Sequence, residues 1–331
     1  MVGKHKDIVM INIHECVSLK PYTVFKIGGP ARYFCEIQNA EALQEAVRWA
    51  KAHTTPFVVL GSGSNVLVSD NGYPGLVIRL LMRDTEKISD EVLYVAAGAS
   101  MATVAHFATT CGLGGFEWAI GIPGTIGGSI VGNAGCYGSE MKDVVQTITI
   151  LECPIFNFQF SINESVSNDL NIENSLKIEN GKLNIHETNN KDCNFSYRHS
   201  IFKDHPERII IGAELKLFPR DSAESTALVR EYSTKRTITQ DIGSPCAGCI
   251  FKNPKIDPDI SGSISAGQLI DAAGLKGMRV GGAMVSLKHG NFIINTGNAT
   301  ARDVKELISI IKSKVKSAHG VELEEEIRYI G

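Results

Sequence analysis

Gly121-Ile-Pro-Gly-Thr-Ile-Gly-Gly-Ser-Ile-Val-Gly-Asn-Ala-Gly135 is the stretch of this chain that most constrains its fold. Six glycines in fifteen residues, with apolar side chains between them, indicate a packed loop rather than a simple turn. Packed backbone polar groups need partners. Glycine permits left-handed backbone and close approach to a ligand, and successive N–H groups form concave anion-binding surfaces. The stretch therefore predicts a binding site for a large anionic ligand.

The chain has another glycine-rich segment, Gly61-Ser-Gly-Ser-Asn65, about sixty residues earlier, between the apolar runs 56–60 and 66–68; along the chain it is the first of the two, and Gly121–Gly135 is the second. Taken alone, it is equally consistent with an ordinary glycine turn at the end of a strand. Neither segment matches a Walker loop or the GxGxxG pattern. Two such loops from separate units suit a dinucleotide, with one loop near the pyrophosphate and the other along the ring system.

The bulk composition favours a globular protein of two or three domains. The chain has 331 residues, 43% of them hydrophobic, and a net charge of −3 without a charged block, which argues against a nucleic-acid surface. No apolar run approaches a membrane span, and residues 1–16 do not resemble a signal peptide. We therefore expect a cytoplasmic protein without a membrane segment. Its eight cysteines, without framework spacing, are expected to be free thiols.

Periodicity and capping residues predict mixed helices and strands. Helices are expected at 40–53, 101–111, 223–235, 266–273 and from Thr300 to Gly320, and strands at 56–60, 75–80, 92–96, 145–151, 208–217, 249–251, 291–295 and 324–330. The polar residues 156–194 are interpreted as an elaborated hairpin or a partly mobile insertion, and 219–225 as a linker into a last domain. Without regular βαβ spacing, the pattern indicates an α+β fold rather than a doubly wound sheet.

Several residues in the second half are candidates for chemistry. The single Cys246-Ala-Gly-Cys249 motif lacks a second pair of ligands for zinc and lies in a strand-like context, so neither a metal nor a redox couple is favoured. Arg198, flanked by Phe195 and Tyr197, is either a solvated charge or an electrophile facing an oxyanion. A terminal strand would point Glu326 and Arg328 to the same side.

These segments together resemble one known family. They are Phe25–Ala31 (FKIGGPA), Leu60–Leu67 (LGSGSNVL), Gly121–Gly128 (GIPGTIGG), Asn133–Gly138 (NAGCYG), Ser196–Ser200 (SYRHS), Ala247–Pro254 (AGCIFKNP), Ala266–Asp271 (AGQLID), Lys288–Phe292 (KHGNF) and Glu324–Arg328 (EEEIR). In this order they resemble the UDP-N-acetylenolpyruvoylglucosamine reductase family (MurB), and its shorter type II branch in particular. The resemblance covers about residues 22–331 apart from the polar insertion.

The resemblance implies an FAD-binding fold of the vanillyl-alcohol-oxidase (PCMH) type in two subdomains, plus a C-terminal α+β substrate-binding domain. We expect boundaries at 1–82, 83–220 and 221–331. It also implies non-covalent FAD and NADPH as cosubstrate. The reaction would reduce the enolpyruvyl ether of UDP-N-acetylglucosamine to UDP-N-acetylmuramate, for peptidoglycan, by hydride transfer from reduced FAD and protonation of an enolate. A monomer without nucleic-acid or metal partners is expected.

Roles follow by motif position. The catalytic residues would be Arg198, Cys249 and Glu326. Residues at the cofactor would be Gly61, Ser62, Gly63, Ser64, Asn65, Gly124, Thr125, Gly127, Gly128, Ser129, Asn133, Gly135 and Arg328. Residues at the substrate would be Tyr197, Arg236, Gln240, Lys252, Asn253 and His289. Cys249 departs from the family, which usually has serine as the proton donor, and it is expected to leave the site open to oxidation and alkylation.

Two alternatives stay open on sequence grounds. A flavin oxidase or dehydrogenase of the same fold would act on another small alcohol or acid, although the motifs of the final domain argue against it. A nucleotide-sugar binding protein without catalysis would tolerate the change to cysteine at position 249. The presence of Arg198, Lys252 and Glu326 argues against that second alternative.

Overall fold

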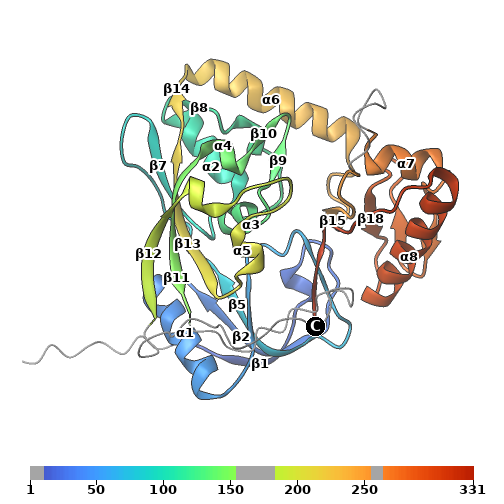
Figure 1. The fold of residues 1–331 in the computed structure, drawn as a ribbon, viewed down its shortest axis with the longest axis horizontal. Coiled ribbons are helices and arrows are strands. Elements are labelled where there is room, and N and C mark those ends of the chain that lie inside the picture. Colours follow the sequence, from blue (N-terminus) through green and yellow to red (C-terminus); the bar gives the residue numbers. More distant parts are fainter. Residues whose placement is uncertain (1–10, 154–182, 255–263) are drawn as a thin grey trace, which may run out of the picture.

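The N-terminal part is built around a four-stranded sheet. The protein's structure is a computed structural model that describes residues 11–153, 183–254 and 264–331 (Figure 1). The sheet has the order β1 (His14–Ser18), β2 (Pro30–Ile37), β5 (Tyr73–Leu80) and β3 (Phe57–Leu60). Strands β2 and β3 both run parallel to β5, while β1 is antiparallel to β2. The 3₁₀ turn η1 (Lys20–Tyr22) lies between β1 and β2.

Helix α1 (Ala40–Ala52) connects β2 to β3. It begins at Asn39, whose side chain accepts a hydrogen bond from the Ala42 N–H at 2.8 Å and so satisfies one of the free amides of the first turn. Its buried face, with Leu43 and Val47, packs into the same core as Ile37 and Ile78 of the sheet. The helix predicted at 40–53 and the strands predicted at 56–60 and 75–80 are confirmed.

The middle part is a five-stranded antiparallel sheet. Its order is β12 (Asn184–Asn189), β11 (Val145–Glu152), β13 (Arg208–Lys216), β7 (Val92–Ala96) and β6 (Thr85–Lys87). The strands predicted at 92–96, 145–151 and 208–217 are confirmed. Residues 154–182, most of the predicted insertion, lie outside the described residues; 184–189 pair with β11 as one strand.

Short helices and hairpins surround this second sheet. The helices are α2 (Met101–Thr110), η2 (Glu117–Ala119), α3 (Ile126–Val131), α4 (Met141–Val144), η5 (Asn190–Cys193) and α5 (Ile201–Asp204). Two small antiparallel pairs are the hairpin of β9 (Gly135–Cys136) with β10 (Ser139–Glu140), and the long-range pair of β8 (Leu113–Gly114) with β14 (Phe218–Pro219). The predicted helix at 101–111 ends at Gly112, which has a left-handed φ of 70°.

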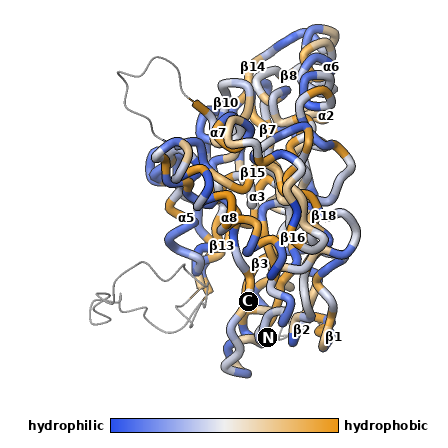
Figure 2. The backbone as a smooth tube through the Cα atoms, turned by 90° about the vertical axis from the view of Figure 1, so that its right-hand side faces the viewer, coloured by the Kyte–Doolittle hydropathy of each residue, from blue (hydrophilic) through white to orange (hydrophobic). Residues whose placement is uncertain are grey.

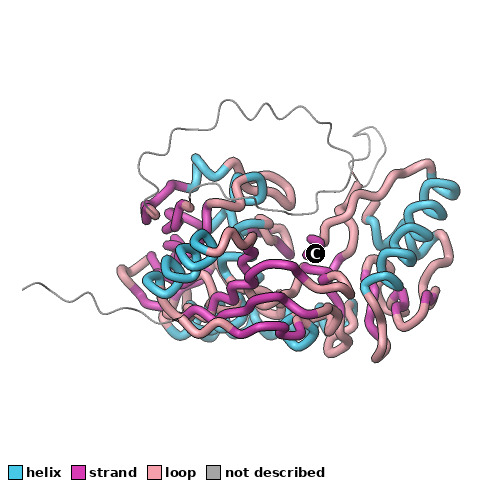
Figure 3. The backbone as a smooth tube through the Cα atoms, turned by 90° about the horizontal axis from the view of Figure 1, so that it is seen from below, coloured by secondary structure: helices cyan, strands magenta, loops and turns pink. Residues whose placement is uncertain are grey.

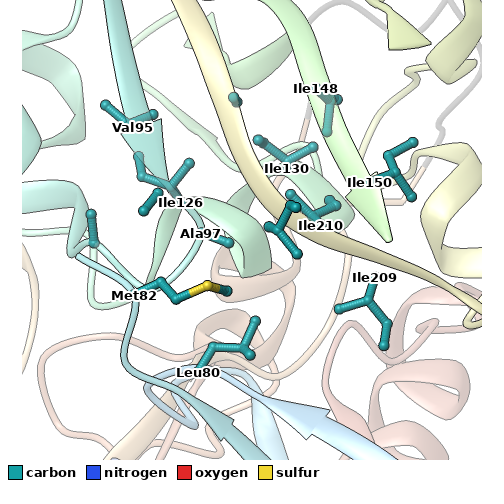
Figure 4. Close-up of a cluster of buried hydrophobic side chains, with 14 of the residues drawn as sticks. Leu80, Met82, Val95, Ala97, Ile126, Ile130, Ile148, Ile150, Ile209 and Ile210 are labelled. Carbon is teal, nitrogen blue, oxygen red and sulfur yellow. The ribbon is translucent and has the colours of Figure 1, made fainter. Parts of the chain in front are cut away.

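One apolar core serves both sheets. Figure 4 shows Leu80, the last residue of β5, and Met82 just after it, near Ile148, Ile150, Ile209 and Ile210 of the second sheet. Ile126 and Ile130 of α3 are fully buried in the same cluster. The second glycine-rich segment is therefore held by its apolar side chains, as its packed composition predicts.

Helix α6 (Ser222–Thr239) begins where a linker was predicted, so the interpretation of residues 219–225 is wrong. Phe218 and Pro219 pair with β8, and Asp221 caps the helix by accepting from the amides of Ala223 and Glu224. Buried Glu117 then accepts from Arg220 at 2.8 Å and from Ser225 at 2.7 Å. These bonds tie the start of α6 to the middle part. Figure 1 shows α6 running from there toward the C-terminal part.

The C-terminal part has a four-stranded antiparallel sheet and two helices (Figure 3). The sheet has the order β15 (Cys246–Cys249), β18 (Phe292–Asn295), β17 (Ala283–Val285) and β16 (Arg279–Val280), and the helices are α7 (Ala266–Ala272) and α8 (Ala301–His319). Ser265 and Thr300 form the capping boxes predicted for α7 and α8. The strand predicted at 249–251 begins earlier, at Cys246, and ends at Cys249.

Long-range contacts join the C-terminal part to residues 66–70, which follow the first glycine-rich loop. Asp70 accepts from the first two amides of α8, at Ala301 and Arg302. After α8 the chain returns as β19 (Arg328–Ile330), which pairs in parallel with β4 (Val66–Val68) directly after the first glycine-rich loop (Figure 1). The C-terminal residues therefore reach the ligand loop by backbone pairing.

Hydrophobic segments are short along the whole described chain. In Figure 2 the orange stretches are interrupted by blue or white ones. Among the helices of residues 11–153, 183–254 and 264–331, none has the length and apolar composition needed to cross a membrane. All eight cysteines lie within these ranges and are free thiols, as predicted.

Candidate active site

The first glycine-rich loop, residues 61–65, leaves β3 and enters β4. Gly63 has a φ of 65°, and a Cβ there would lie 2.4 Å from the carbonyl oxygen of Tyr22, so only glycine fits. Within the described part of the chain, the N–H groups of Ser62, Gly63 and Ser64 have no hydrogen-bond acceptor. Three successive free amides on a loop without bulk form the kind of concavity that binds phosphate oxygens.

The second glycine-rich segment is more self-contained than its sequence suggests. Thr125 caps α3 by accepting from the Gly128 N–H at 3.4 Å. The amides of Ile126 and Gly127 donate to the carbonyls of Ala99 and Ala97, both at 2.9 Å. A Cβ at Gly127 would lie 3.0 Å from the Cβ of Ala97. The packed backbone was predicted to need partners, which a cofactor could supply; for these two amides the protein itself supplies them.

The two glycine-rich segments contact each other. A Cβ at Gly61 would lie 2.4 Å from Thr125 Oγ1, and one at Gly124 would lie 3.5 Å from Ser64 Oγ. Ser129 is buried beside Gly124, and Gly128 is exposed. The free amides of the first loop thus lie beside small residues of the second. This arrangement fits the pyrophosphate of a dinucleotide such as FAD, which needs donors and close backbone approach.

Asn65 links the first loop to the C-terminal segment. Its side-chain amide donates to the Glu326 carbonyl at 3.3 Å, and its own carbonyl accepts from the Arg328 N–H at 3.0 Å. The Glu326 N–H donates to the Ile250 carbonyl at 2.7 Å, and Lys252 N–H donates to the Glu324 carbonyl at 2.8 Å. The end of β15 and residues 324–326 therefore run side by side next to the ligand loop.

Arg198 and Glu326 meet at the centre of this arrangement. Arg198 Nε lies 2.9 Å from Glu326 Oε1, and the two side chains are only 23% and 15% exposed. Arg198 Nη1 also donates to the Gly135 carbonyl at 3.4 Å. The backbone of Arg198 has a left-handed φ of 57°, which costs a non-glycine residue about 1 kcal/mol or more. A strained backbone at a buried charged residue marks a functional position.

Burial controls protonation at this site. It raises the pKa of Glu326 above its usual range, more than Arg198, Lys203 and Lys252 lower it. It also raises the pKa of Cys249 to about 12, with the Glu326 carboxylate adding to the rise and Arg198 and Arg236 opposing it. Cys249 is therefore a neutral thiol at neutral pH. Alkylating agents and oxidants react with the thiolate. The raised pKa therefore disfavours the oxidation and alkylation of Cys249 that were expected from the sequence.

Three predicted substrate residues lie around Arg198. The ring of the exposed Tyr197 lies 5.5 Å from the Arg198 guanidinium, and its hydroxyl accepts from the Asn253 N–H at 3.2 Å. The Asn253 side chain accepts from the Ala266 N–H at 3.1 Å, so it caps the region before α7. Lys252 forms an ion pair with the exposed Glu324. The structure thus brings Tyr197, Lys252 and Asn253 together with the predicted catalytic residues.

The other predicted contacts have different surroundings. Arg236 is buried and donates to the Gly121 carbonyl at 2.9 Å, to Gln240 at 3.2 Å and to Cys136 Sγ at 3.4 Å. It therefore fixes α6 to the second glycine-rich segment, with Gln240 as its partner. His289 packs on Phe292 at 4.5 Å and accepts from the Asn291 N–H, and burial lowers its pKa.

Asn133 also has an internal role. It is buried with a left-handed φ of 42°. Its amide donates to Glu140 at 2.7 Å and to the Ser196 carbonyl at 2.9 Å, and its oxygen accepts from the Lys142 N–H at 3.0 Å. The side chain is fully engaged within the protein, so any contact of Asn133 with a cofactor would come from its backbone. Gly135 follows in β9 and accepts from Arg198.

Lys203 is a site residue that the sequence analysis missed. It lies in α5, five residues after Arg198, and its ammonium group donates to the Arg198 carbonyl at 3.1 Å. The only available signal was its spacing, about one helical turn beyond the arginine of the SYRHS motif. A lysine at that spacing is common on any helix surface.

We expect Gly61→Ala to weaken FAD binding by roughly tenfold or more. The new Cβ would lie 2.4 Å from Thr125 Oγ1, so the two glycine-rich segments must separate, and overpacking of this kind costs about 1–3 kcal/mol. Gly132→Ala is the matched control, because its Cβ meets only ordinary contact at 3.7 Å. Titration of the apoprotein with FAD, followed by flavin fluorescence, gives both affinities. Equal affinities would contradict the assigned cradle.

Comparison with known proteins matches the N-terminal and middle parts to one family model and the C-terminal part to another. Residues 31–153 match the model of the FAD binding domain, and residues 240–330 match that of the UDP-N-acetylenolpyruvoylglucosamine reductase C-terminal domain. The chain is 38% identical to the UDP-N-acetylenolpyruvoylglucosamine reductase of Caldanaerobacter subterraneus subsp. tengcongensis, covering 100% of this chain and 98% of that one. It is 36% identical to the reductase of the same name from a Synechococcus strain, covering 96% and 91%.

A solved structure agrees over the same length. The reductase MurB from Thermus caldophilus superposes with a TM-score of 0.73 at 32% identity, covering 97% of this chain and 99% of that one. The α+β fold with an FAD-binding portion and a C-terminal domain, predicted from the sequence, is confirmed. The chain is an FAD-dependent oxidoreductase and belongs to the UDP-N-acetylenolpyruvoylglucosamine reductase (MurB) family.

Proposed function

We propose that this protein uses NADPH to reduce the enolpyruvyl ether of UDP-N-acetylglucosamine to UDP-N-acetylmuramate, in the cytoplasm and as a monomer. The observation that carries the proposal is the convergence of Arg198, Cys249 and Glu326. They come from three distant segments: Arg198 Nε lies 2.9 Å from Glu326 Oε1, and the Glu326 N–H donates to the carbonyl of Ile250, the residue after Cys249. Membership of the family supports the substrate class.

The charges of the site suit an anionic substrate. Four basic residues act on this site: Arg198, Lys203 and Lys252 lower the pKa of Glu326, and Lys252 and Arg328 lower the pKa of Lys203. Positive charge in a half-buried site attracts carboxylate and diphosphate groups. Lys252 and Asn253 would bind the nucleotide-sugar side, with Tyr197 at the rim.

The protein residues divide the reducing step between them. When bound, FAD would supply the redox chemistry, which is hydride transfer between NADPH and the vinyl carbon of the substrate. Arg198 would hold the substrate carboxylate. Glu326, whose pKa is raised by burial, would in its protonated form donate a hydrogen bond to the enolate as negative charge develops there. The neutral Cys249 thiol would then give its proton to the adjacent carbon.

We also propose the domain division 1–82, 83–220 and 221–331, with the first two parts at the cofactor and the third at the substrate. Strand β19 of the third domain pairs with β4 of the first, so the C-terminal segment contacts the cofactor part as well as the substrate part in this division. Glu326 and Arg328 would thus act at the junction.

The test uses the two half-reactions of the purified protein reconstituted with FAD. Under anaerobic conditions NADPH is expected to bleach the flavin absorption, and the enolpyruvyl sugar is expected to restore it with formation of UDP-N-acetylmuramate. NADH in the first step measures the coenzyme preference. Bleaching that the enolpyruvyl sugar does not reverse, but a small alcohol-derived acceptor does, would overturn the proposal in favour of a different flavin enzyme.

A further inference from the structure

The turn that carries Arg198 is held in an unusual conformation. Ser196 and His199 exchange two backbone hydrogen bonds, of 3.0 and 3.1 Å, so Tyr197 and Arg198 form a two-residue tip. The second tip residue has a φ of 57°, a conformation that glycine or asparagine adopts more readily than arginine. The direction of the guanidinium depends on this backbone. The tip therefore needs support from residues outside the turn.

The flanks of the turn are fixed by side chains of the middle part. Asn133 donates to the Ser196 carbonyl at 2.9 Å, and the buried Ser200 hydroxyl donates to the Val131 carbonyl at 2.9 Å. Neither bond reaches the peptide group of Arg198 itself. That carbonyl accepts from the Lys203 ammonium group, at 3.1 Å.

We propose that Lys203 is a positioning residue for the reducing step: its ammonium group clamps the Arg198 carbonyl and so fixes the guanidinium against Glu326. The inference rests on the proposed roles of Arg198 and Glu326. A lysine on the short helix α5 would ordinarily extend into water. Here its side chain is half-buried and points back along the chain to the Arg198 carbonyl, just before α5.

The surroundings of Lys203 make this placement costly, which argues for a purpose beyond solubility. Burial lowers its pKa, as do Lys252 and Arg328, while Glu326 and Glu324 act in the opposite direction. The same ammonium group lowers the pKa of Glu326, together with Arg198 and Lys252, against the rise caused by burial. Lys203 thus influences both members of the pair, Arg198 by a hydrogen bond and Glu326 by its charge.

The test compares Lys203→Met with Lys203→Arg in FAD-loaded protein. Each is reduced with dithionite and mixed anaerobically with the enolpyruvyl sugar, so that the measurement does not depend on the coenzyme. We expect Lys203→Met to slow flavin reoxidation by roughly tenfold to a hundredfold, because loss of positioning without loss of a reacting group costs up to about that much. Lys203→Arg keeps a cationic donor and should restore most of the rate.

The pH profile separates positioning from a general loss of structure. Without the ammonium group the pKa of Glu326 rises further, so the pH above which reoxidation slows should move upward in Lys203→Met and return in Lys203→Arg. Lys191→Met, at an exposed position of η5, is the control and should leave the rate and the profile unchanged.

Three outcomes overturn the inference. They are a Lys203→Met protein with the wild-type rate and pH profile, an equal loss in flavin reduction by NADPH and in reoxidation, and a Lys203→Arg protein that binds FAD normally but is as slow as Lys203→Met. If Lys203→Met does not bind FAD, the Arg variant alone decides: an FAD-loaded Lys203→Arg protein that is reoxidised roughly tenfold or more slowly than the wild type overturns the inference. Failure of the wild-type protein to be reoxidised by the enolpyruvyl sugar would instead overturn the proposed function.

Discussion

Cys249→Ala is expected to slow reoxidation of the reduced flavin by the enolpyruvyl sugar by about 10²- to 10⁴-fold, the usual contribution of a positioned proton donor. Reduction of the flavin by NADPH should be spared, because it needs no proton from this residue. Burial raises the pKa of the Cys249 thiol to about 12, so the proton is present on sulfur throughout the neutral range. A thiol of that pKa remains far more acidic than the C–H bond formed in the product.

Stopped-flow absorption of the two half-reactions measures this effect. Cys246→Ala is the matched control, since Cys246 is a buried thiol of the same strand β15 and is not placed in the site. Cys249→Ser, which supplies the hydroxyl usual in the family, should retain much of the reoxidation rate. Equal losses in both half-reactions of Cys249→Ala would remove the donor role and indicate a packing defect.

Alkylation gives an independent check on the state of the thiol. Because the thiolate is scarce at neutral pH, iodoacetamide should inactivate the folded protein slowly, and the rate should rise as the pH approaches 12. The sequence alone led to the opposite expectation, a readily attacked cysteine. The difference arises from burial beside Glu326, which no local sequence signal reveals.

The elements and the cofactor loops were predictable because they depend on local patterns. Helix α1 follows from its apolar spacing and the cap at Asn39, and both predicted capping boxes of the C-terminal part are present. The glycines at 61 and 63 mark positions where a side chain would collide with Thr125 or Tyr22. A glycine-rich loop indicates that some other group lies close to its backbone, but the sequence does not show whether that group is a ligand or another segment of the protein.

The sequence does not reveal hydrogen bonding between residues far apart in the chain. Residues 219–225 read as a linker because the bonds of Arg220 and Ser225 to Glu117 span more than a hundred positions. The contacts of Arg236 with the substrate and of Asn133 with the cofactor stay predictions, and in the structure their donors are directed mostly to Gly121, Cys136, Glu140 and Ser196. A polar side chain in a motif can serve the ligand or the loop that holds the ligand, and only the fold decides.

Glu326→Gln is the second change with a large expected effect. We expect it to slow reoxidation by the enolpyruvyl sugar by roughly 10²-fold or more, the cost of removing a donor aimed at developing negative charge. Glutamine keeps the size of the side chain but has no acidic proton to share, and it removes the ion pair with Arg198 at 2.9 Å. Reduction by NADPH and the FAD content should stay close to those of the wild type.

The pH dependence gives this prediction its sharpest form. Since Glu326 must be protonated when the enolate develops, and burial raises its pKa, wild-type reoxidation should be fast at low pH and fall as the pH rises through that raised pKa. Cys249 cannot cause the same fall, because it keeps its proton until the pH nears 12. The alkaline fall should therefore vanish in Glu326→Gln, whose side chain is neutral at every pH, and persist in Glu322→Gln, an exposed control paired with Lys316. A Glu326→Gln protein that turns over at the wild-type rate, or that keeps the wild-type profile, would show that another group carries the proton.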